Sequence, residues 1–461
     1  MDPAKLEQIK TAMNKMGVAA QKASQQLAIA PNNQKNKALT TAADLLVERT
    51  QNLLEANSED VRQIEKTVAD AKKTLSDYTG NAERLLSEPK AIDALQNAVR
   101  NINRYNPAFI DRLTLTKDSI KNMAQGLRDI AKLDDPVGRN LAELKPRSDK
   151  LQIHRVSVPL GVIGIIYESR PNVTADAGAL CLKSGNACIL RGGSDSHRSS
   201  MAIIDCLKAG LEAAKLDPNC IQLVEETDRA AVNHLLTMSD TVDVIVPRGG
   251  KSLVKVIQEK SKIPVFSHLE GINHIFVDKE FDEEKAIKVI VNSKLRRTGV
   301  CGALETLLIH KNVAESFGAK ITKILLDENC EVRGDETIQA FDRRVVKATK
   351  GDWNTEYLAP IISIGVVDDL QAAITHIQSH GSGHTDGIIS ENRENITEFQ
   401  RRVDSAIVVV NASTQFADGG EFGMGAEIGI STGRMHARGP VGVEQLTTFK
   451  YYVMGVGTIR G

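Results

Sequence analysis

The feature that most constrains the fold is a regular alternation of strand-like and helix-like segments after residue 158. Repeated strand–helix units build a parallel sheet with helices on both faces, and ligands usually bind beyond the carboxyl ends of its strands. The sequence therefore predicts an α/β fold. The strands expected in the first such set are 158–167, 187–190, 221–224, 242–246 and 264–266, with helices at 174–183 and 199–215 and starting near 228 and 250.

A second alternating set starts near 272–277 and predicts a further α/β region. It continues through a helix at 283–295, an apolar run at 303–309 and a strand at 406–411. A glycine-rich stretch follows at 419–433.

The first 134 residues are polar, nearly free of glycine and helical in pattern. Asp134–Gly138 ends the helix, and an alternating segment follows at 151–156, so residues 135–156 are expected to form a hairpin that projects from the body. The last apolar segment, 446–454, is also strand-like. It is expected to pair either with the hairpin or with another subunit.

Charge and composition exclude several classes of function. Lys and Arg (58) nearly balance Asp and Glu (59), so the chain lacks the basic character of a nucleic-acid or anionic-membrane binder. No apolar run approaches the roughly 20 residues that span a bilayer, and the N-terminus lacks the apolar core of a secretory signal. Six cysteines without paired spacing predict neither disulfides nor a zinc site, so a reducing cytoplasm is expected.

One cysteine stands in a setting that suits chemistry. Cys301 follows a predicted helix and is flanked by Gly299 and Gly302, which let the backbone approach a substrate and aim N–H groups at an oxyanion. Arg296 and Arg297 favour the reactive thiolate. The pattern alone fits a nucleophile and an ordinary loop cysteine equally well.

Two turns that follow predicted strands suit a nucleotide. Arg191 could pair with a ribose 2′-phosphate and Asp195 could accept from a ribose hydroxyl. The second turn suits a pyrophosphate at a helix start. Neither has the spacing of the common dinucleotide fingerprint, and each alone is more often a plain turn, but together they favour a nicotinamide cofactor. The residues are Arg191, Gly192, Gly193, Ser194 and Asp195, then Pro247, Arg248, Gly249 and Gly250.

Other polar residues have weaker support. Arg170, at the end of the first parallel strand, could clamp a phosphate or carboxylate, or simply cap a turn. His268 and His384 lie in expected turns, and no pair of histidines has metal-ligand spacing. We therefore expect no metal site and no catalytic role for either histidine.

Several stretches from residue 158 to the C-terminus, about two thirds of the chain, together resemble one family. YESRPNV (167–173), TGVC (298–301) and EFGMGAEIGIST (421–432) resemble the gamma-glutamyl phosphate reductases of the aldehyde dehydrogenase superfamily. The resemblance implies a Rossmann-type cofactor domain, an α/β catalytic domain and a small β oligomerisation element. The implied boundaries are 1–134 with 157–267, then 268–434, and 135–156 with 435–461.

The resemblance also implies roles for matching residues. Cys301 takes the place of the nucleophile that forms a thioester, and Ser169 falls near the oxyanion position. Glu356 takes the place of the glutamate that holds the nicotinamide ribose. The two turns named above would hold NADPH. Arg170, Asn172 and Arg297 are the candidates for binding the substrate.

The implied reaction is NADPH-dependent reduction of L-glutamyl 5-phosphate to L-glutamate 5-semialdehyde, on the route to proline. His268 stands where hydrolytic relatives carry a general-base glutamate, so the thioester would be reserved for hydride or phosphate. A hydrolytic or CoA-acylating dehydrogenase is the alternative. The resemblance further implies a homo-oligomer and a separate glutamate 5-kinase as functional partner.

Overall fold

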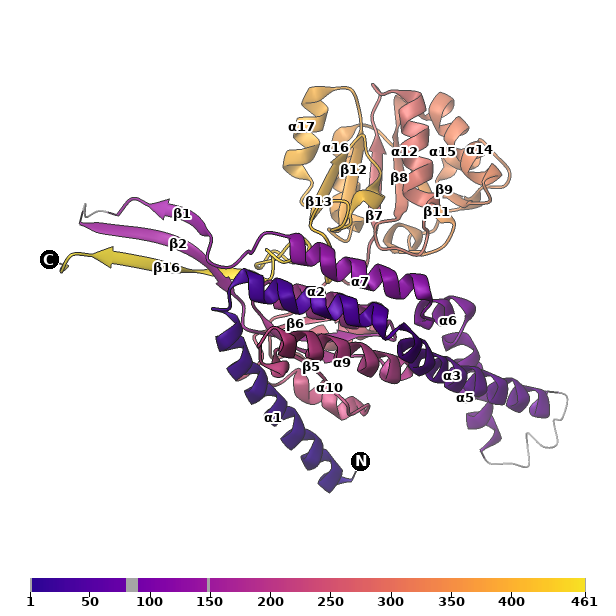
Figure 1. The fold of residues 1–461 in the computed structure, drawn as a ribbon. Helices are drawn as coiled ribbons and strands as arrows, with labels where there is room; N and C mark the ends of the chain where they lie inside the picture. Colours follow the sequence, from indigo (N-terminus) through magenta and orange to yellow (C-terminus); the bar gives the residue numbers. More distant parts are fainter. Residues whose placement is uncertain (1, 80–89, 147–149, 461) are drawn as a thin grey trace. The chain divides into compact units, whose positions relative to one another are not determined.

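A computed structural model describes residues 2–79, 90–146 and 150–460 (Figure 1). The described chain divides into two compact units. Residues 1–249, 256–265 and 446–461 make up the first unit, and residues 250–255 and 266–445 make up the second. Among the described residues, no helix combines the length and the apolar character that a membrane crossing needs.

The first unit contains a four-stranded parallel sheet in the order β5-β4-β3-β6. Its central strand β3 is wholly buried and apolar, as expected of a parallel strand covered on both faces. The strands are β3 (Val162–Tyr167), β4 (Ala187–Arg191), β5 (Ile221–Leu223) and β6 (Val244–Arg248).

Helices of the N-terminal region pack against the helices that connect these strands: α2 packs on α9, and α7 packs on both α2 and α8 (Figure 1). The helical character expected of residues 1–134 is confirmed, apart from 80–89, which lie outside the described residues. The helices of this unit are α1 (Pro3–Leu27), α2 (Asn32–Glu48), α3 (Thr50–Tyr78), α5 (Ala91–Arg104), α6 (Pro107–Leu113), α7 (Lys117–Lys132), α8 (Asn172–Lys183), α9 (His197–Ala213) and α10 (Arg229–Leu235).

The run at 158–167, expected to be one strand, is two strands in different sheets. Gly161 breaks it with φ +127°, a conformation that residues with a Cβ rarely adopt. A Cβ there would also lie 2.1 Å from Oδ2 of Asp243, which accepts from the Val162 N–H. The prediction of a strand at 264–266 was wrong. Only Val265 pairs there, in an isolated bridge to Ile245.

A separate antiparallel sheet has the order β1-β2-β16 (Figure 1). The hairpin is confirmed as β1 (Asn140–Leu144) and β2 (Leu151–Pro159), with residues 147–149 outside the described chain. The terminal strand β16 (Thr447–Gly455) pairs with β2 along its whole length. Of the two partners expected for it, the hairpin of the same chain is therefore the one observed.

The second unit contains a seven-stranded parallel sheet in the order β10-β9-β11-β8-β7-β12-β13. Helix α12 has the predicted bounds, and strands appear close to the predicted 272–277, 303–309 and 406–411. The strands are β7 (Asn273–Val277), β8 (Leu304–His310), β9 (Glu331–Gly334), β10 (Val346–Lys347), β11 (Ile361–Val367), β12 (Thr385–Ile389) and β13 (Ile407–Val410).

Helices cover both faces of this sheet and enclose two apolar clusters, one around Ile275 and Leu307 and one around Phe276 and Leu308. Neighbouring residues of β7 and β8 point to opposite faces, which is why they divide between the clusters. The helices are α12 (Glu283–Leu295), α13 (Lys311–Val313), α14 (Ala319–Asp327), α15 (Glu336–Gln339), α16 (Leu370–His380) and α17 (Arg393–Arg402). Helix α11 (Lys251–Lys260) contributes no residue to these clusters, and its residues divide between the two units. The short strands β14 (Ile430–Ser431) and β15 (Gly439–Pro440) pair with each other.

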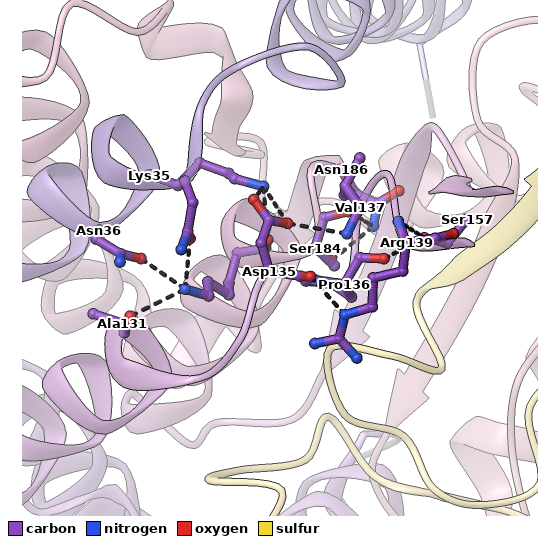
Figure 2. A network of polar contacts seen from close by, with 12 residues as sticks. Lys35, Asn36, Ala131, Asp135, Pro136, Val137, Arg139, Ser157, Ser184 and Asn186 are labelled. Atoms are coloured by element: carbon purple, nitrogen blue, oxygen red, sulfur yellow. Dashed lines mark hydrogen bonds and ion pairs between the residues drawn. The ribbon is translucent and has the colours of Figure 1, made fainter. Parts of the chain in front are cut away.

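Two buried lysines anchor the base of the hairpin (Figure 2). Lys35 Nζ lies 2.6 Å from Asp135 Oδ2 and donates to the Lys183 carbonyl. Lys183 Nζ donates to Asn36 Oδ1 and to the Ala131 carbonyl at 2.7 and 3.0 Å. Burial lowers the pKa of Lys183 to about 8. The network therefore joins α2, α7 and α8 to the segment that enters the hairpin.

The lowered pKa of Lys183 predicts a pH-dependent stability. Between about pH 8 and 10.5 the unfolded chain keeps a proton on this amine that the folded chain has lost, so raising the pH through this window stabilises the fold. In Lys183→Met this contribution is absent. We expect the difference in free energy of unfolding between the native chain and Lys183→Met to grow by about 2 kcal/mol between about pH 7 and pH 9.5.

Urea titrations of both proteins at both pH values would measure this difference. Contributions of other titrating groups cancel in the comparison. A difference that stays constant or shrinks would contradict the lowered pKa.

Candidate functional site

Cys301 lies on the loop between α12 and β8. Of the six cysteines, all within the described residues, Cys301 alone is partly exposed. Burial raises the pKa of Cys220 and of Cys330 to about 12, which keeps those two as thiols. Accessibility therefore singles out Cys301 as the candidate nucleophile.

The side chain of Asn273 holds the Cys301 loop. Asn273 is the buried first residue of β7, and its Nδ2 donates to the carbonyls of Cys301 (2.6 Å) and Ala303 (2.7 Å). Its Oδ1 accepts from the Thr385 N–H at the start of β12. One amide thus fixes the loop against two neighbouring strands. Sequence reasoning missed Asn273, since a single asparagine before an apolar run has no distinctive pattern.

Gly271 brings Glu356 close to the same loop. The Gly271 N–H donates to Glu356 Oε1 at 3.0 Å, and a Cβ on Gly271 would lie 2.0 Å from the Cys301 carbonyl oxygen. Burial is the main cause that raises the pKa of Glu356. The predicted ribose-binding carboxylate and the predicted nucleophile are therefore joined through one glycine, in a space that no larger residue fits.

A fully buried ion pair joins the two flanks of the loop. Lys294 Nζ, on α12, lies 2.6 Å from Glu305 Oε2, on β8. The Leu358 N–H, two residues after Glu356, approaches Glu305 Oε1 at 3.4 Å. Burial raises the pKa of Glu305 to about 7, and the charge of Lys294 opposes that rise. The buried pair therefore contacts both the segments that flank Cys301 and the segment that follows Glu356.

Two histidines lie beside Cys301. One donor atom from each of His268, Cys301 and His384 lies within 4.8 Å of the other two. The imidazole rings of the two histidines pack edge to face, with their centroids 5.0 Å apart. Sequence spacing could not find this group, because the three residues come from three separate segments that precede β7, β8 and β12.

The group therefore lies at the amino ends of three adjacent strands of the second sheet. Ligands of a doubly wound sheet usually bind beyond the carboxyl ends of its strands. In this chain, the candidate residues of the first unit are the ones at that end. Those residues follow β3, β4 and β6. The two sheets present their candidate residues at opposite strand ends.

In the first unit, the turns after β3 and β4 are in direct contact. Ser169 Oγ donates to Asp195 Oδ2 at 3.1 Å, and a Cβ on Gly193 would lie 2.2 Å from that hydroxyl oxygen. Asp195 also accepts from Arg104 (2.6 Å) and from the Tyr105 hydroxyl (3.1 Å). The structure thus brings Ser169 together with the predicted nucleotide turn, and three donors already surround Asp195.

The guanidinium of Arg191 is held at the end of β4 by the carbonyls of Gly192 (2.7 Å) and Thr227 (2.6 Å). The amino end of α9, which follows this turn, is capped by a carboxylate, because Ser199 N–H donates to Asp60 Oδ2. A phosphate is better suited to a helix start without such a cap. The turn Pro247–Gly250, at the start of α11, is the remaining candidate for binding a phosphate of the cofactor.

The substrate-binding candidates divide between the units. Arg170 and Asn172 follow β3 in the first unit, where Asn172 Nδ2 donates to Asp176 at 3.2 Å. Burial raises the pKa of Asp176 to about 6. Arg297 belongs to the Cys301 loop of the second unit, and its carbonyl accepts from Gln415.

Comparison with known proteins places this arrangement in a family. The model of the aldehyde dehydrogenase family matches residues 112–336 and 344–451. The chain belongs to the aldehyde dehydrogenase family and has its α/β fold. An acetylating aldehyde dehydrogenase from Geobacillus thermoglucosidasius shares that fold, with TM-score 0.63, 15% identity and coverage of 99% of both chains.

Within this family the chain belongs with the gamma-glutamyl phosphate reductases. It is 51% identical to the gamma-glutamyl phosphate reductase of Paramagnetospirillum magneticum, with 97% of both chains covered. It is 52% identical to that of Beijerinckia indica, with 97% of this chain and 96% of the relative covered. A crystal structure of the Thermotoga maritima protein of this name has TM-score 0.87 and 38% identity, and covers 97% of this chain and 100% of that one.

The central place of Asn273 predicts a large effect of its removal. Asn273→Ala leaves two buried carbonyls without their donor, at about 1–3 kcal/mol each. We expect the free energy of unfolding to fall by about 2–5 kcal/mol in urea titrations. The matched control is Asn354→Ala, which removes exposed hydrogen bonds to the Lys350 carbonyl and to His380 Nδ1 and should change stability by less than about 0.5 kcal/mol. Equal effects of the two substitutions would refute this role.

Proposed function

We propose that this chain reduces L-glutamyl 5-phosphate to L-glutamate 5-semialdehyde with NADPH, through a thioester on Cys301. The observation that carries the proposal is the accessible Cys301 on a loop fixed by Asn273 and joined through Gly271 to Glu356. Relatives about half identical over nearly the whole chain are named for this activity.

The first step uses the nucleophile alone. The Cys301 thiolate attacks the acyl carbon of the acyl phosphate, the new C–S bond forms, and the C–O bond to phosphate breaks. Phosphate is a good leaving group, so this step needs no strong acid. The Cys301 N–H and a neighbouring donor would stabilise the oxyanion, with Ser169 as the other candidate. Arg170, Asn172 and Arg297 remain our candidates for the phosphate and the carboxylate of the substrate.

The residues present fit a nicotinamide dinucleotide. Gly193 leaves room for the Ser169 hydroxyl within the nucleotide turn, and Arg191 supplies a fixed cation for a 2′-phosphate. Pro247–Gly250 would face the pyrophosphate, and Glu356 would accept from the nicotinamide ribose. When bound, this cofactor supplies the hydride that reduces the acyl group. The Cys301 thiolate is then the leaving group as the aldehyde forms.

The alternative is a dehydrogenase that passes the thioester to water or to CoA. His268 takes the place of the carboxylate that activates water in hydrolytic relatives, which favours phosphate as the natural partner. An imidazole can also act as a base, so the acceptor must be identified by experiment.

The decisive assay runs the reaction in reverse, because the acyl phosphate is too labile to supply. With pyrroline-5-carboxylate and NADP⁺, we expect reduction of the cofactor only when inorganic phosphate is present. Reduction without phosphate would indicate a hydrolytic enzyme, and reduction dependent on CoA an acylating one. Cys301→Ser should abolish turnover and leave NADPH binding intact, and near-normal turnover of that variant would refute the nucleophile.

The choice of NADPH over NADH is assigned to Arg191. Arg191→Gln removes the cation expected to pair with the 2′-phosphate, and a charge-assisted hydrogen bond contributes about 1.5–3 kcal/mol. We expect KM for NADPH to rise about 10–100-fold. KM for NADH, which lacks that phosphate, is the internal control and should change less than about threefold. A parallel rise in both values would assign Arg191 a structural role instead.

We also propose that the chain forms a homo-oligomer through the sheet β1-β2-β16. Strand β16 is an edge strand that exposes Phe449, Tyr451, Tyr452 and Val453, and such an edge favours a partner. A sedimentation mass of one chain would contradict this. A separate kinase that phosphorylates glutamate is the expected source of the substrate.

A further inference from the structure

We propose that His268, Cys301 and His384 form a binding site for a soft divalent cation of the zinc class, which reversibly blocks the nucleophile. Their three donor atoms lie within 4.8 Å of one another. Zinc binds thiolate at about 2.3 Å and imidazole at about 2.0–2.1 Å, which separates tetrahedral ligands by roughly 3.5 Å. The donors therefore need to approach by about 1 Å, within reach of side-chain rotation.

An unpartnered nitrogen is the second observation that points to a ligand. The His384 side chain is wholly buried, and its Nε2 has no hydrogen-bond partner. A buried polar atom without a partner is destabilising, and a bond to a metal would offset that cost.

The outer contacts of both imidazoles match those of metal-bound histidines. A histidine ligand almost always donates its second ring N–H to an oxygen, which fixes the ring and its tautomer. His268 Nδ1 lies 2.7 Å from the Ile430 carbonyl, and His384 Nδ1 lies 2.8 Å from Thr385 Oγ1. The carbonyl can only accept, so His268 donates from Nδ1 and presents Nε2 as its ligand atom.

The ligand set selects the kind of metal. Two imidazoles and a thiolate suit Zn²⁺ and Co²⁺, whereas Mg²⁺ and Ca²⁺ prefer oxygen ligands, which this group lacks. On binding, the Cys301 thiol releases its proton to solvent and the sulfur bonds to the metal. No electron is transferred, so a chelator restores the free thiol. Three protein ligands leave a fourth position for water.

Metal binding and catalysis are separable properties of this group. The proposed reaction uses the Cys301 thiolate, so a metal on that sulfur would inhibit it. Binding itself depends only on the three donors and holds whichever reaction the enzyme catalyses. The test therefore reads binding directly.

The full-length chain, first treated with a chelator and dialysed, would be titrated with Co²⁺ alone. We expect one equivalent to bind, with visible d–d bands and a near-ultraviolet sulfur-to-cobalt charge-transfer band, and we expect Zn²⁺ to displace it. Cys301→Ser should lose the charge-transfer band. His268→Asn and His384→Asn should each weaken binding at least about tenfold.

Two measurements keep the result unambiguous. The exposed His436→Asn is the matched control and should bind Co²⁺ as the native chain does. Because His384 is buried, the Co²⁺ titration of His384→Asn counts only if the circular dichroism spectrum of the variant is native. If it is not native, the test rests on His268→Asn, because His268 is partly exposed. A missing charge-transfer band, or one that survives Cys301→Ser, overturns the proposal. A silent reductase assay with intact Co²⁺ spectra would overturn the proposed function alone.

Discussion

The second unit depends on the carboxamide of Asn273, a neutral group with both donors and an acceptor in one plane. Its Nδ2 donates to two loop carbonyls, and its Oδ1 accepts from one strand N–H. A charged side chain could not donate and accept at once in this buried position. The loop that carries Cys301 is therefore held by the sheet itself, and the thiol can remain partly exposed while its backbone is fixed.

The buried pair Lys294–Glu305 adds a second layer to the same support. Such a pair contributes little net stability, because desolvation offsets most of the attraction. Its value lies in geometry, since the partners flank the Cys301 loop and Glu305 also meets the segment that follows Glu356. In the first unit, Lys35 and Lys183 join the hairpin base to three helices in a similar way.

Much of this arrangement follows from local sequence. Helix α12 is bounded as its pattern indicates, because Asp282 caps its start and an apolar stripe runs along it. The glycines that flank Cys301 made it a candidate nucleophile, although the same pattern fits a loop cysteine equally well. The break at Gly161 was not, since its cause is the carboxylate of Asp243, which is distant in the chain. Strand β12 was missed because Thr385-Asp386-Gly387 is polar, although Asp386 is buried against His274.

The pairing of His268 with His384 illustrates the same limit. Each residue lies in a turn without a distinctive motif, and only the order of strands in the sheet brings their rings to within 5.0 Å. Periodicity describes which face a residue takes within its own element. It does not describe which elements become neighbours, and so the residues around Cys301 could not be predicted from spacing.

Strand β16 has a consequence for how the chain is made. It completes the antiparallel sheet β1-β2-β16 by pairing with β2, and the residues between these two strands include the whole second unit. The second unit is therefore synthesised before β16. Its sheet can therefore close early, while β2 waits with an unpaired edge. The residues that complete the β1-β2-β16 sheet are thus made long after those that begin it.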